Sequence, residues 1–457
     1  MSNSLNSNYK SDDTTNNVLV NVLDNTSSGR TYSIIDSYWT AASNNTQSTK
    51  TLDINITRSF GSNTLDQGAG PFAILGTVMD AYDLLKKEEP NITFSKLNIY
   101  WSTSNRPTGG NISIGNIGTS YYGQDHIAAA TNPNTTIRSL YILGNLGTDS
   151  DQYDTGVVAH EFGHYTEATI FRADNIGGSH TGSNNLDPRV AFGEGFGNAF
   201  GSIVRNDPIY FDSLGTNNTT GFFLNLESGS ITNPGPTNEG SVQNIIWDLY
   251  DTASDGETVN LGFSAIYSVL RNEQKNTNYF TTIYSFVNGV KTRNPSLSSA
   301  IDTLVGKEFT CSINSDFGGT GGGCDQSTAT STPANCRSSH IRATVNQAAI
   351  PYTHSTQPIQ LNFGGNGTNK YCATQYYALS SLTGSRTITI TPAAGCDLDL
   401  YLYNRGTRIA FANAGGEGQT DTITTSNFST LNMLEIRTWT ISSSQTTGTC
   451  TYTLTIN

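Results

Sequence analysis

A glutamate beside two histidines is the group of residues best suited to chemistry in this sequence. His160 and His164 are four positions apart, so on a helix both imidazoles lie on one face and can bind one metal ion. Glu161 is rotated from His160 by about 100° around the helix axis, which places it beside the metal, where it can take a proton from a water on that metal. Apolar neighbours indicate a buried helix rather than a surface helix with two solvated histidines; they are Val157, Val158, Phe162 and Tyr165.

A carboxylate on the next predicted helix can supply a third ligand. A catalytic zinc usually takes three protein ligands and one water, and Glu194 is the only charged residue between Arg189 and Arg205. A lone buried carboxylate is costly unless a metal or a cation accompanies it, so the alternative to metal ligation is an ion pair with one of those arginines. Asn198, one turn further on, is predicted to hydrogen-bond one of the histidines. Glycines at positions 193, 195, 197 and 201 are expected to allow close approach to the first helix.

Together the two motifs resemble the gluzincin metallopeptidases. The first reads His-Glu-Phe-Gly-His over 160–164, and residues 193–198 read Gly-Glu-Gly-Phe-Gly-Asn. The second run is similar to the Gly-Glu-Gly-Trp-Gly-Asp run of fungalysin-like enzymes, with Phe for Trp and Asn for Asp. The metzincin pattern requires a histidine six residues after the motif. Position 170 is Ile, so this sequence does not have the metzincin pattern.

The resemblance extends over residues 70–310 and implies an α+β fold. It implies a thermolysin-like, two-lobed zincin domain with an α+β upper half, a helical lower half and a cleft between them. It further implies Zn²⁺ bound by His160, His164 and Glu194. Gluzincins also use a His or Tyr to stabilise the oxyanion, and Tyr250 and His180 are the candidates here. Two departures are the long interval from His164 to Glu194 and the Asn at position 198.

The pattern of apolar residues and turns predicts the elements that must position these side chains. Strands are expected at 18–22, 31–35, 51–56, 97–101, 127–130 and 139–144. Helices are expected over 72–87, begun by Pro71, from Thr155 with Asp154 as N-cap, from Pro188 with Asp187 as N-cap, and over 239–252, 261–274, 279–292 and 296–307.

The sequence after residue 356 changes to a period of two, which predicts an all-β sandwich. The runs 396–403 and 452–456 resemble the bacterial pre-peptidase C-terminal domain, a small β-sandwich found behind the catalytic domains of secreted peptidases. Asp397 and Asp399 share one face of a strand, so they form either a calcium site or a solvated face. The predicted domains are therefore a polar tail and β lead-in (1–65), a catalytic domain (66–310), a Cys- and Gly-rich linker (311–355) and the sandwich (356–457).

Composition narrows the classes of function. Charged residues make up 13% of the chain and the formal net charge is −13, which excludes nucleic-acid binding as the main function because that needs a basic surface. The longest apolar stretch, 70–79, ends at Asp80 and is shorter than the roughly 20 residues of a membrane span. No Rossmann or P-loop motif predicts a nucleotide.

Six cysteines, all in the last third of the chain, indicate disulfides and an oxidising compartment. They lie at 311, 324, 336, 372, 396 and 450. The alternatives to disulfides are a zinc cluster and six free thiols. The sequence has no Cys-x-x-Cys pair, which argues against a zinc ribbon. Three cysteines lie inside the sandwich, so we expect one to pair with the 311–336 segment. The polar N-terminus shows no signal peptide. Because the cysteines indicate an oxidising compartment, we expect a secreted or surface-anchored protein whose export signal has been removed.

These observations predict a secreted zinc endopeptidase that hydrolyses extracellular proteins with Glu161 as general base. Two alternatives remain at this stage. One is a surface-binding protein or adhesin with a vestigial zinc site, which attaches to a surface or matrix through the sandwich. The other is a narrow enzyme, either an aminopeptidase or a glycoprotein-selective peptidase. Glu161 argues against a purely structural site, because a structural zinc gains nothing from an adjacent base.

Overall fold

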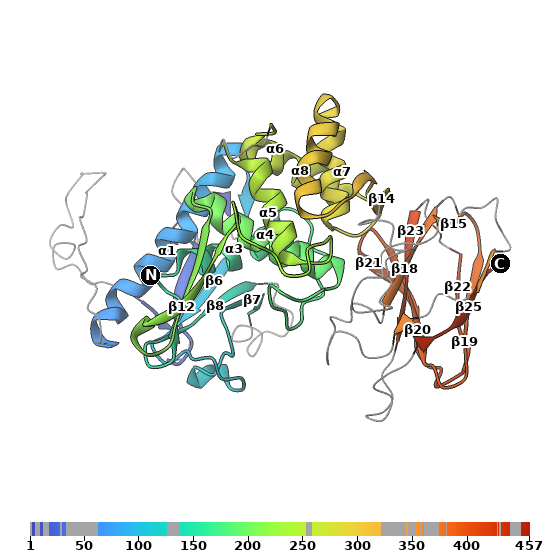
Figure 1. The fold of residues 1–457 in the computed structure, drawn as a ribbon. Coiled ribbons are helices and arrows are strands. Elements are labelled where there is room, and N and C mark those ends of the chain that lie inside the picture. The colour runs from blue at the N-terminus through green and yellow to red at the C-terminus, as the bar shows by residue number, and fades with distance from the viewer. Residues whose placement is uncertain are drawn as a thin grey trace. The chain divides into compact units, whose positions relative to one another are not determined.

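The computed structural model describes most of the chain as a mixed α+β protein with several sheets and seven α-helices among the described residues (Figure 1). The structure describes residues 2–4, 10–11, 18–27, 30–32, 63–125, 137–252, 258–320, 344–345, 352–355, 359–360, 374–380, 382–426, 428, 431–438 and 449–457. The expected strands at 51–56 and 127–130 lie outside the described residues, as does most of the one at 31–35.

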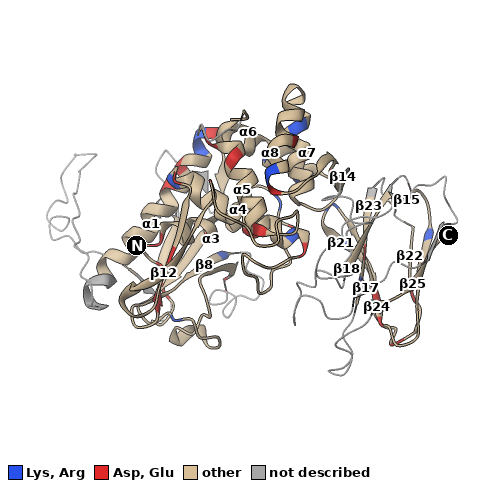
Figure 2. Cartoon of the chain, viewed as in Figure 1, with Lys and Arg blue, Asp and Glu red and all other residues tan. Residues whose placement is uncertain are grey.

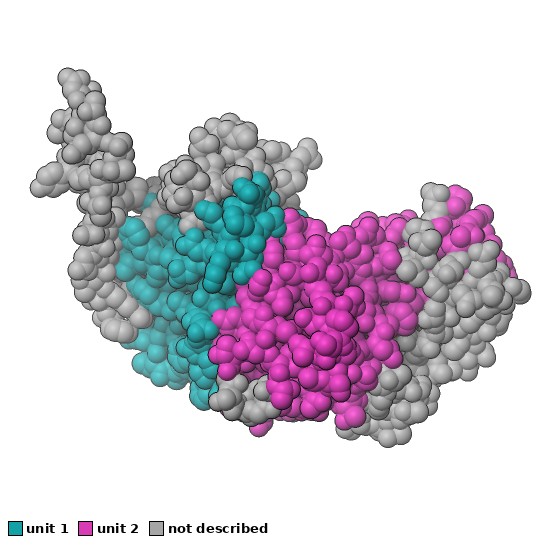
Figure 3. Space-filling model, turned by 90° about the horizontal axis from the view of Figure 1, so that it is seen from above, with its two compact units in different colours: residues 1–170, 200–225 teal, residues 171–199, 226–457 magenta. Residues whose placement is uncertain are grey.

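The chain divides into two compact units, coloured separately in Figure 3. Unit 1 comprises residues 1–170 and 200–225, and unit 2 comprises 171–199 and 226–457. These limits differ from the predicted domains. Within the predicted β lead-in, the strand β3 (Val18–Asp24) pairs in parallel with β6 (Leu97–Trp101) inside one sheet.

Unit 1 contains two larger sheets and the helix that carries His160, Glu161 and His164. The larger sheet has the order β1-β3-β6-β8-β7, with β1 at Ser2–Ser4, β8 at Arg138–Ile142 and β7 at Tyr121–Gln124. The smaller sheet is antiparallel, with the order β12-β11-β10-β9: Thr220–Asn225, Ile209–Leu214, Asp149–Ser150 and Gly144–Asn145. The hairpin β11–β12 has no counterpart among the predicted strands.

Two helices of unit 1 pack through aromatic rings. Helix α1 (Asn63–Glu88) and helix α3 (Thr155–Thr169) meet where the Tyr82 ring lies 4.8 Å from that of Phe162. The prediction that Pro71 begins the first helix is wrong, because α1 begins eight residues earlier and contains Pro71 in its interior. Gly70 lies against Trp101, where a Cβ would come within 2.8 Å of the indole, so this turn of the helix needs glycine to approach β6.

Unit 2 begins with helices and ends with a sandwich. Its helices are α5 (Glu239–Tyr250), α6 (Gly262–Val269), α7 (Ile283–Arg293) and α8 (Ser298–Glu308). Helix α4 (Pro188–Arg205) begins in unit 2 and ends in unit 1. Pro188 is its first residue as predicted, and Asp187 accepts the Arg189 backbone N–H at 3.0 Å. In contrast, Asp154 lies at the start of α3 but makes no side-chain cap; its Oδ2 accepts from Ser213 instead.

The sandwich consists of two sheets that share one hydrophobic core. One has the order β15-β18-β23-β20-β21: Thr344–Val345, Thr374–Ser380, Leu431–Thr438, Leu398–Asn404 and Thr407–Ala412. The other has the order β16-β25-β19-β22: Tyr352–Ser355, Tyr452–Ile456, Arg386–Pro392 and Asp421–Thr425. Since β15 and β16 belong to these sheets, the sandwich begins before residue 356, and the predicted boundary lies too late.

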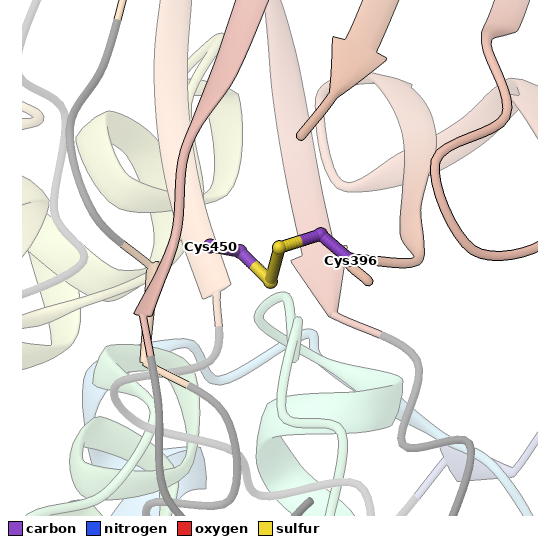
Figure 4. The surroundings of a disulfide bond; sticks show 2 residues. All are labelled: Cys396 and Cys450. Carbon is purple, nitrogen blue, oxygen red and sulfur yellow. A yellow bond between two sulfur atoms is a disulfide. The ribbon is translucent and has the colours of Figure 1, made fainter. Parts of the chain in front are cut away.

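A disulfide joins segments that lead into the two sheets. Cys396, just before β20, is bonded to Cys450, just before β25, and both side chains belong to the shared core (Figure 4). Cys311 is also disulfide-bonded, with a partner outside the described residues. Charged residues are sparse and of both signs over the described ribbon (Figure 2), and none of its helices is long and apolar enough to cross a membrane.

Candidate metal centre

Helix α3 brings the two histidines of the motif together. The Nε2 atoms of His160 and His164 lie 3.1 Å apart, and the rings are nearly perpendicular at 87°. Two ligands bound to one tetrahedral zinc at 2.0–2.1 Å are about 3.3 Å apart, so the pair is spaced as a zinc site requires. His160 is buried, because the helix packs its apolar neighbours into the core around it.

Glu161 completes the group on α3. Ligand-type atoms of His160, Glu161 and His164 all lie within 4.8 Å of one another. The Glu161 side chain is buried, which keeps the carboxylate out of bulk water at the position where a general base is needed. The two imidazole nitrogens are donors that suit zinc, and the Glu161 carboxylate lies beside them, so the residues of α3 fit the metal that the sequence predicts.

A second carboxylate on the same helix orients His164. Its Nδ1 lies 3.3 Å from Oε2 of Glu167, which is almost fully buried. A ligand histidine commonly directs its other ring nitrogen to a carboxylate, which fixes the ring. Sequence reasoning assigned such a role to Asn198 and missed Glu167, although the spacing of three residues on one helix was a usable signal. Asn198 donates instead to Oε1 of Gln243 at 2.8 Å.

The aromatic ring of Tyr210 borders the site from β11. Its centroid lies 6.2 Å from that of His160. Burial raises the pKa of Tyr210 well above its usual range, and the charges of Asp212 and Glu161 add to the shift. Tyr210 is therefore a neutral phenol beside the histidine. It lies on a strand absent from the predictions, so no local pattern pointed to it.

Glu194 lies on α4 and is held by two polar side chains of unit 2. Its Oε1 accepts from Nδ2 of Asn175 at 3.0 Å, and its Oε2 lies 3.2 Å from Nε2 of His180. Of the two arginines in the alternative, Arg189 pairs with Asp187 and Arg205 pairs with Asp207.

The glycines of α4 allow close approach, but to different neighbours. A Cβ at Gly193 would come within 2.4 Å of the Asn175 side chain, and one at Gly195 within 2.6 Å of Val242 on α5. Gly201 alone of these three lies against α3, where a Cβ would be 2.9 Å from the Gly156 carbonyl oxygen. The prediction of helix contact is therefore confirmed for Gly201, while Gly193 admits the residue that binds Glu194.

The two candidates for oxyanion stabilisation have very different surroundings. His180 lies between two carboxylates, with Nδ1 2.7 Å from Oε2 of Glu239 and Nε2 facing Glu194. Tyr250 is the last residue of α5, eleven positions after Glu239, which is about 16 Å along the helix axis. Its ring packs on Trp247, and burial raises its pKa. The structure thus associates His180, not Tyr250, with Glu194.

The calcium candidates in the sandwich are buried rather than solvated. Asp397 and Asp399 are 6% and 2% exposed, so the alternative of a solvated face is wrong. Burial raises the pKa of Asp399 to about 6 against the opposing hydrogen bond from Tyr401, and repulsion from the neighbouring aspartates adds to the shift. Neither residue belongs to a close group of three ligand-type side chains within the described part of the chain.

Comparisons with known proteins by sequence found no matching family model and no matching curated protein. Among solved structures, a precursor of protealysin, a metalloproteinase from Serratia proteamaculans, is 9% identical, with 64% of this chain and 87% of that chain covered and a TM-score of 0.35. The pre-peptidase C-terminal domain of a Bacillus anthracis collagenase is 15% identical, with coverages of 26% and 93% and a TM-score of 0.19.

A third structure, the Aeromonas hydrophila periplasmic inhibitor of g-type lysozyme PliG, is 16% identical, with coverages of 25% and 95% and a TM-score of 0.17. All three TM-scores are low.

Proposed function

We propose that the protein is a zinc-dependent endopeptidase that acts outside the cytoplasm. The observation that carries the proposal is the pair of Nε2 atoms of His160 and His164, 3.1 Å apart, with the buried Glu161 carboxylate in the same close group. Glu194 is the proposed third ligand. It lies on the same helix as Gly201, which approaches α3 closely.

Glu161 and Glu167 have different roles in the proposed hydrolysis. Zinc, when bound, acts as a Lewis acid toward the scissile carbonyl. Glu161 accepts a proton from the attacking water and later delivers it to the leaving amine, which general acid–base catalysis requires of one positioned group. Glu167 holds the His164 ring through Nδ1, which would leave Nε2 available to a bound zinc.

Location outside the cytoplasm is supported by the cysteines. The Cys396–Cys450 disulfide is buried in the sandwich core, and Cys311 is also oxidised. Such bonds persist in oxidising compartments and are rare in the cytosol of most organisms. The proposed substrates are accordingly extracellular proteins or peptides, and the sandwich is the proposed attachment module.

The test is cleavage of a peptide library by the full-length chain, with mass-spectrometric mapping of products. We expect internal cleavage, one zinc per chain, and loss of zinc in His160→Ala and His164→Ala. Glu161→Gln should keep zinc and lower kcat by at least about 100-fold, whereas Glu417→Gln, at an exposed sandwich position, should change neither. Wild-type turnover in Glu161→Gln would refute the mechanism, and trimming from the N-terminus alone would favour an aminopeptidase.

A further inference from the structure

A second cluster of metal-ligand type lies in unit 1 and plays no part in the proposed hydrolysis. Oxygen atoms of Asp149, Asp151 and Asp212 all lie within 4.8 Å of one another. Asp149 and Asp151 flank Ser150 at the end of β10, and Asp212 lies on β11. None of the three was singled out by the sequence, because β10 is only two residues long and its partner strand was not predicted.

Strand register explains why the three side chains converge. Asp149 is paired with Leu214 across the antiparallel strands. Continuing that register by two residues sets Asp151 opposite Asp212. Side chains two residues apart on a strand share a face, so all three carboxylates face the same side. Like charges directly opposite each other destabilise a strand pair, so this arrangement requires something that compensates the charge.

One buried oxygen atom of each carboxylate in the cluster has no hydrogen-bond partner. Asp151 is 3% exposed, and the Ser120 hydroxyl donates to its Oδ2 at 2.5 Å. Its Oδ1 has no hydrogen-bond partner, and the same holds for Oδ1 of Asp149 and Oδ1 of Asp212. Within the described part of the chain, no Lys or Arg forms an ion pair with any of the three. An unpartnered buried carboxylate oxygen is costly, and here there are three.

We propose that Asp149, Asp151 and Asp212 bind a calcium ion. The donors are all carboxylate oxygens, which Ca²⁺ prefers, whereas zinc prefers nitrogen and sulfur. Two ligands at the Ca²⁺–O distance of about 2.4 Å can be at most about 4.8 Å apart, and the three oxygens satisfy that limit. Ca²⁺ takes six to eight oxygen ligands, so water and backbone oxygen atoms complete the shell.

The site ties together the segments that support the zinc helix. Asp151 is four residues before Thr155, the first residue of α3, and Asp212 is two residues from Tyr210, whose ring lies beside His160. A cation shared by β10 and β11 therefore fixes the entry to α3 and the position of Tyr210. Its function is to stabilise unit 1 around the zinc motif, with no direct part in the reaction.

The experiment measures thermal unfolding of the full-length chain during a CaCl₂ titration. The chain carries Glu161→Gln to prevent self-digestion and is held at one equivalent of zinc. We expect Ca²⁺ to raise the Tm by at least about 3 °C at saturation. Asp151→Asn and Asp212→Asn should each raise the Ca²⁺ midpoint by at least about tenfold, because each removes a charged ligand. The matched control is Asp397→Asn with Asp399→Asn, which should keep the full response.

Folding of the variants is checked in chelator without calcium. Asparagine relieves the repulsion in the cluster, so each single variant should have a calcium-free Tm no lower than that of the parent. Terbium luminescence excited through tyrosine gives a direct measure of binding, and Asp212→Asn should abolish the emission that Ca²⁺ displaces. The proposal is overturned if Ca²⁺ leaves the Tm unchanged, if Asp151→Asn and Asp212→Asn respond like the parent, or if the sandwich variant abolishes the response. Absence of any calcium response would instead indicate a proton shared by the carboxyl groups.

Discussion

His180 bridges two carboxylates, with its Nε2 atom 3.2 Å from Oε2 of Glu194 and its Nδ1 atom 2.7 Å from Oε2 of Glu239. The side chain is 32% exposed, so it is open to solvent while it contacts a proposed zinc ligand. This arrangement allows two roles for His180. It can orient Glu194, or it can stabilise the oxyanion of the reaction.

Substitution of His180 should distinguish these two roles from each other and from Tyr250. We expect His180→Ala to weaken zinc binding about 10- to 100-fold, because a contact that orients a ligand is lost. If His180 also stabilises the oxyanion, kcat at saturating zinc should fall by a further factor of about 100 or more. Zinc affinity by competition with a chelator and kcat at saturating zinc are the two measurements.

Tyr250→Phe is the matched comparison. It removes one hydroxyl at the far end of α5 and should leave both zinc affinity and kcat within about twofold of wild type, a difference of order RT in free energy. A large loss of kcat in Tyr250→Phe together with wild-type behaviour of His180→Ala would reverse the assignment.

Local spacing along one helix was the part of the site that the sequence could predict. The pairing of His160 with His164 follows from the period of the α-helix, and so would the contact of His164 with Glu167. The contact of His180 with Glu239 spans 59 residues, and no local pattern encodes it. The same reason applies to Asp212, whose neighbours depend on the register between two strands.

The fold was predictable to a similar extent. Capping and apolar periodicity identified the helices of unit 2, because those signals are local. They failed at Pro71, where α1 continues through a residue that normally ends or begins a helix. The pairing of β3 with β6 is long-range and parallel, so no local pattern joins the first strands to this sheet.

A buried arginine connects α4 to the sandwich. Arg189 is 2% exposed, donates to both oxygens of Asp187 and to the Tyr376 hydroxyl, and lies 3.5 Å from Glu435. Its guanidinium also covers the Phe280 ring at 4.5 Å. Because Arg189 is on the same helix as Glu194, the sandwich contacts the helix that carries the proposed third ligand.

Arg189→Leu should destabilise the protein by about 3–5 kcal/mol, since it leaves buried carboxylates without their cation. The control is Arg293→Leu, which breaks a partly exposed pair with Glu273 and should cost no more than about 1 kcal/mol. Urea unfolding in the Glu161→Gln background measures both. Equal effects of the two substitutions would show that the buried network does not stabilise the fold.

The Cys396–Cys450 disulfide should contribute substantially to stability. The two cysteines are 54 residues apart, and closing a loop of that size stabilises by about 4 kcal/mol in the chain-entropy estimate. Replacing both cysteines by Ala should lower the free energy of unfolding by roughly that amount. Urea unfolding of the double variant, compared with the parent that keeps the Cys396–Cys450 disulfide, provides the measurement.

The same disulfide restricts the partner of Cys372. With Cys396 and Cys450 bonded to each other, the remaining intramolecular partners of Cys372 are Cys311, Cys324 and Cys336. Non-reducing peptide mapping should therefore find the Cys372 peptide linked to a peptide from 311–336. A free Cys372 would contradict the expected link between this segment and the sandwich.

A buried carboxyl on α5 should make stability depend on pH. Asp248 is 6% exposed, and burial, together with the charges of Glu227 and Glu308, raises its pKa to about 7 despite the opposing charge of Lys307. Because the folded state then binds the proton more tightly than the unfolded chain, this contribution is fully present below about pH 4. It is lost as the pH rises through about 7, since the folded protein must then bury a charge.

Asp248→Asn removes that dependence, so its stability relative to the parent should improve between pH 4 and pH 8 by at most about 4 kcal/mol. Urea unfolding at the two pH values, at fixed metal concentrations, measures the change, with Asp83→Asn on the exposed side of α1 as control for the loss of one carboxylate. A relative stability of Asp248→Asn that is the same at both pH values, or that worsens at pH 8, would show that Asp248 is already ionised in the folded protein at low pH.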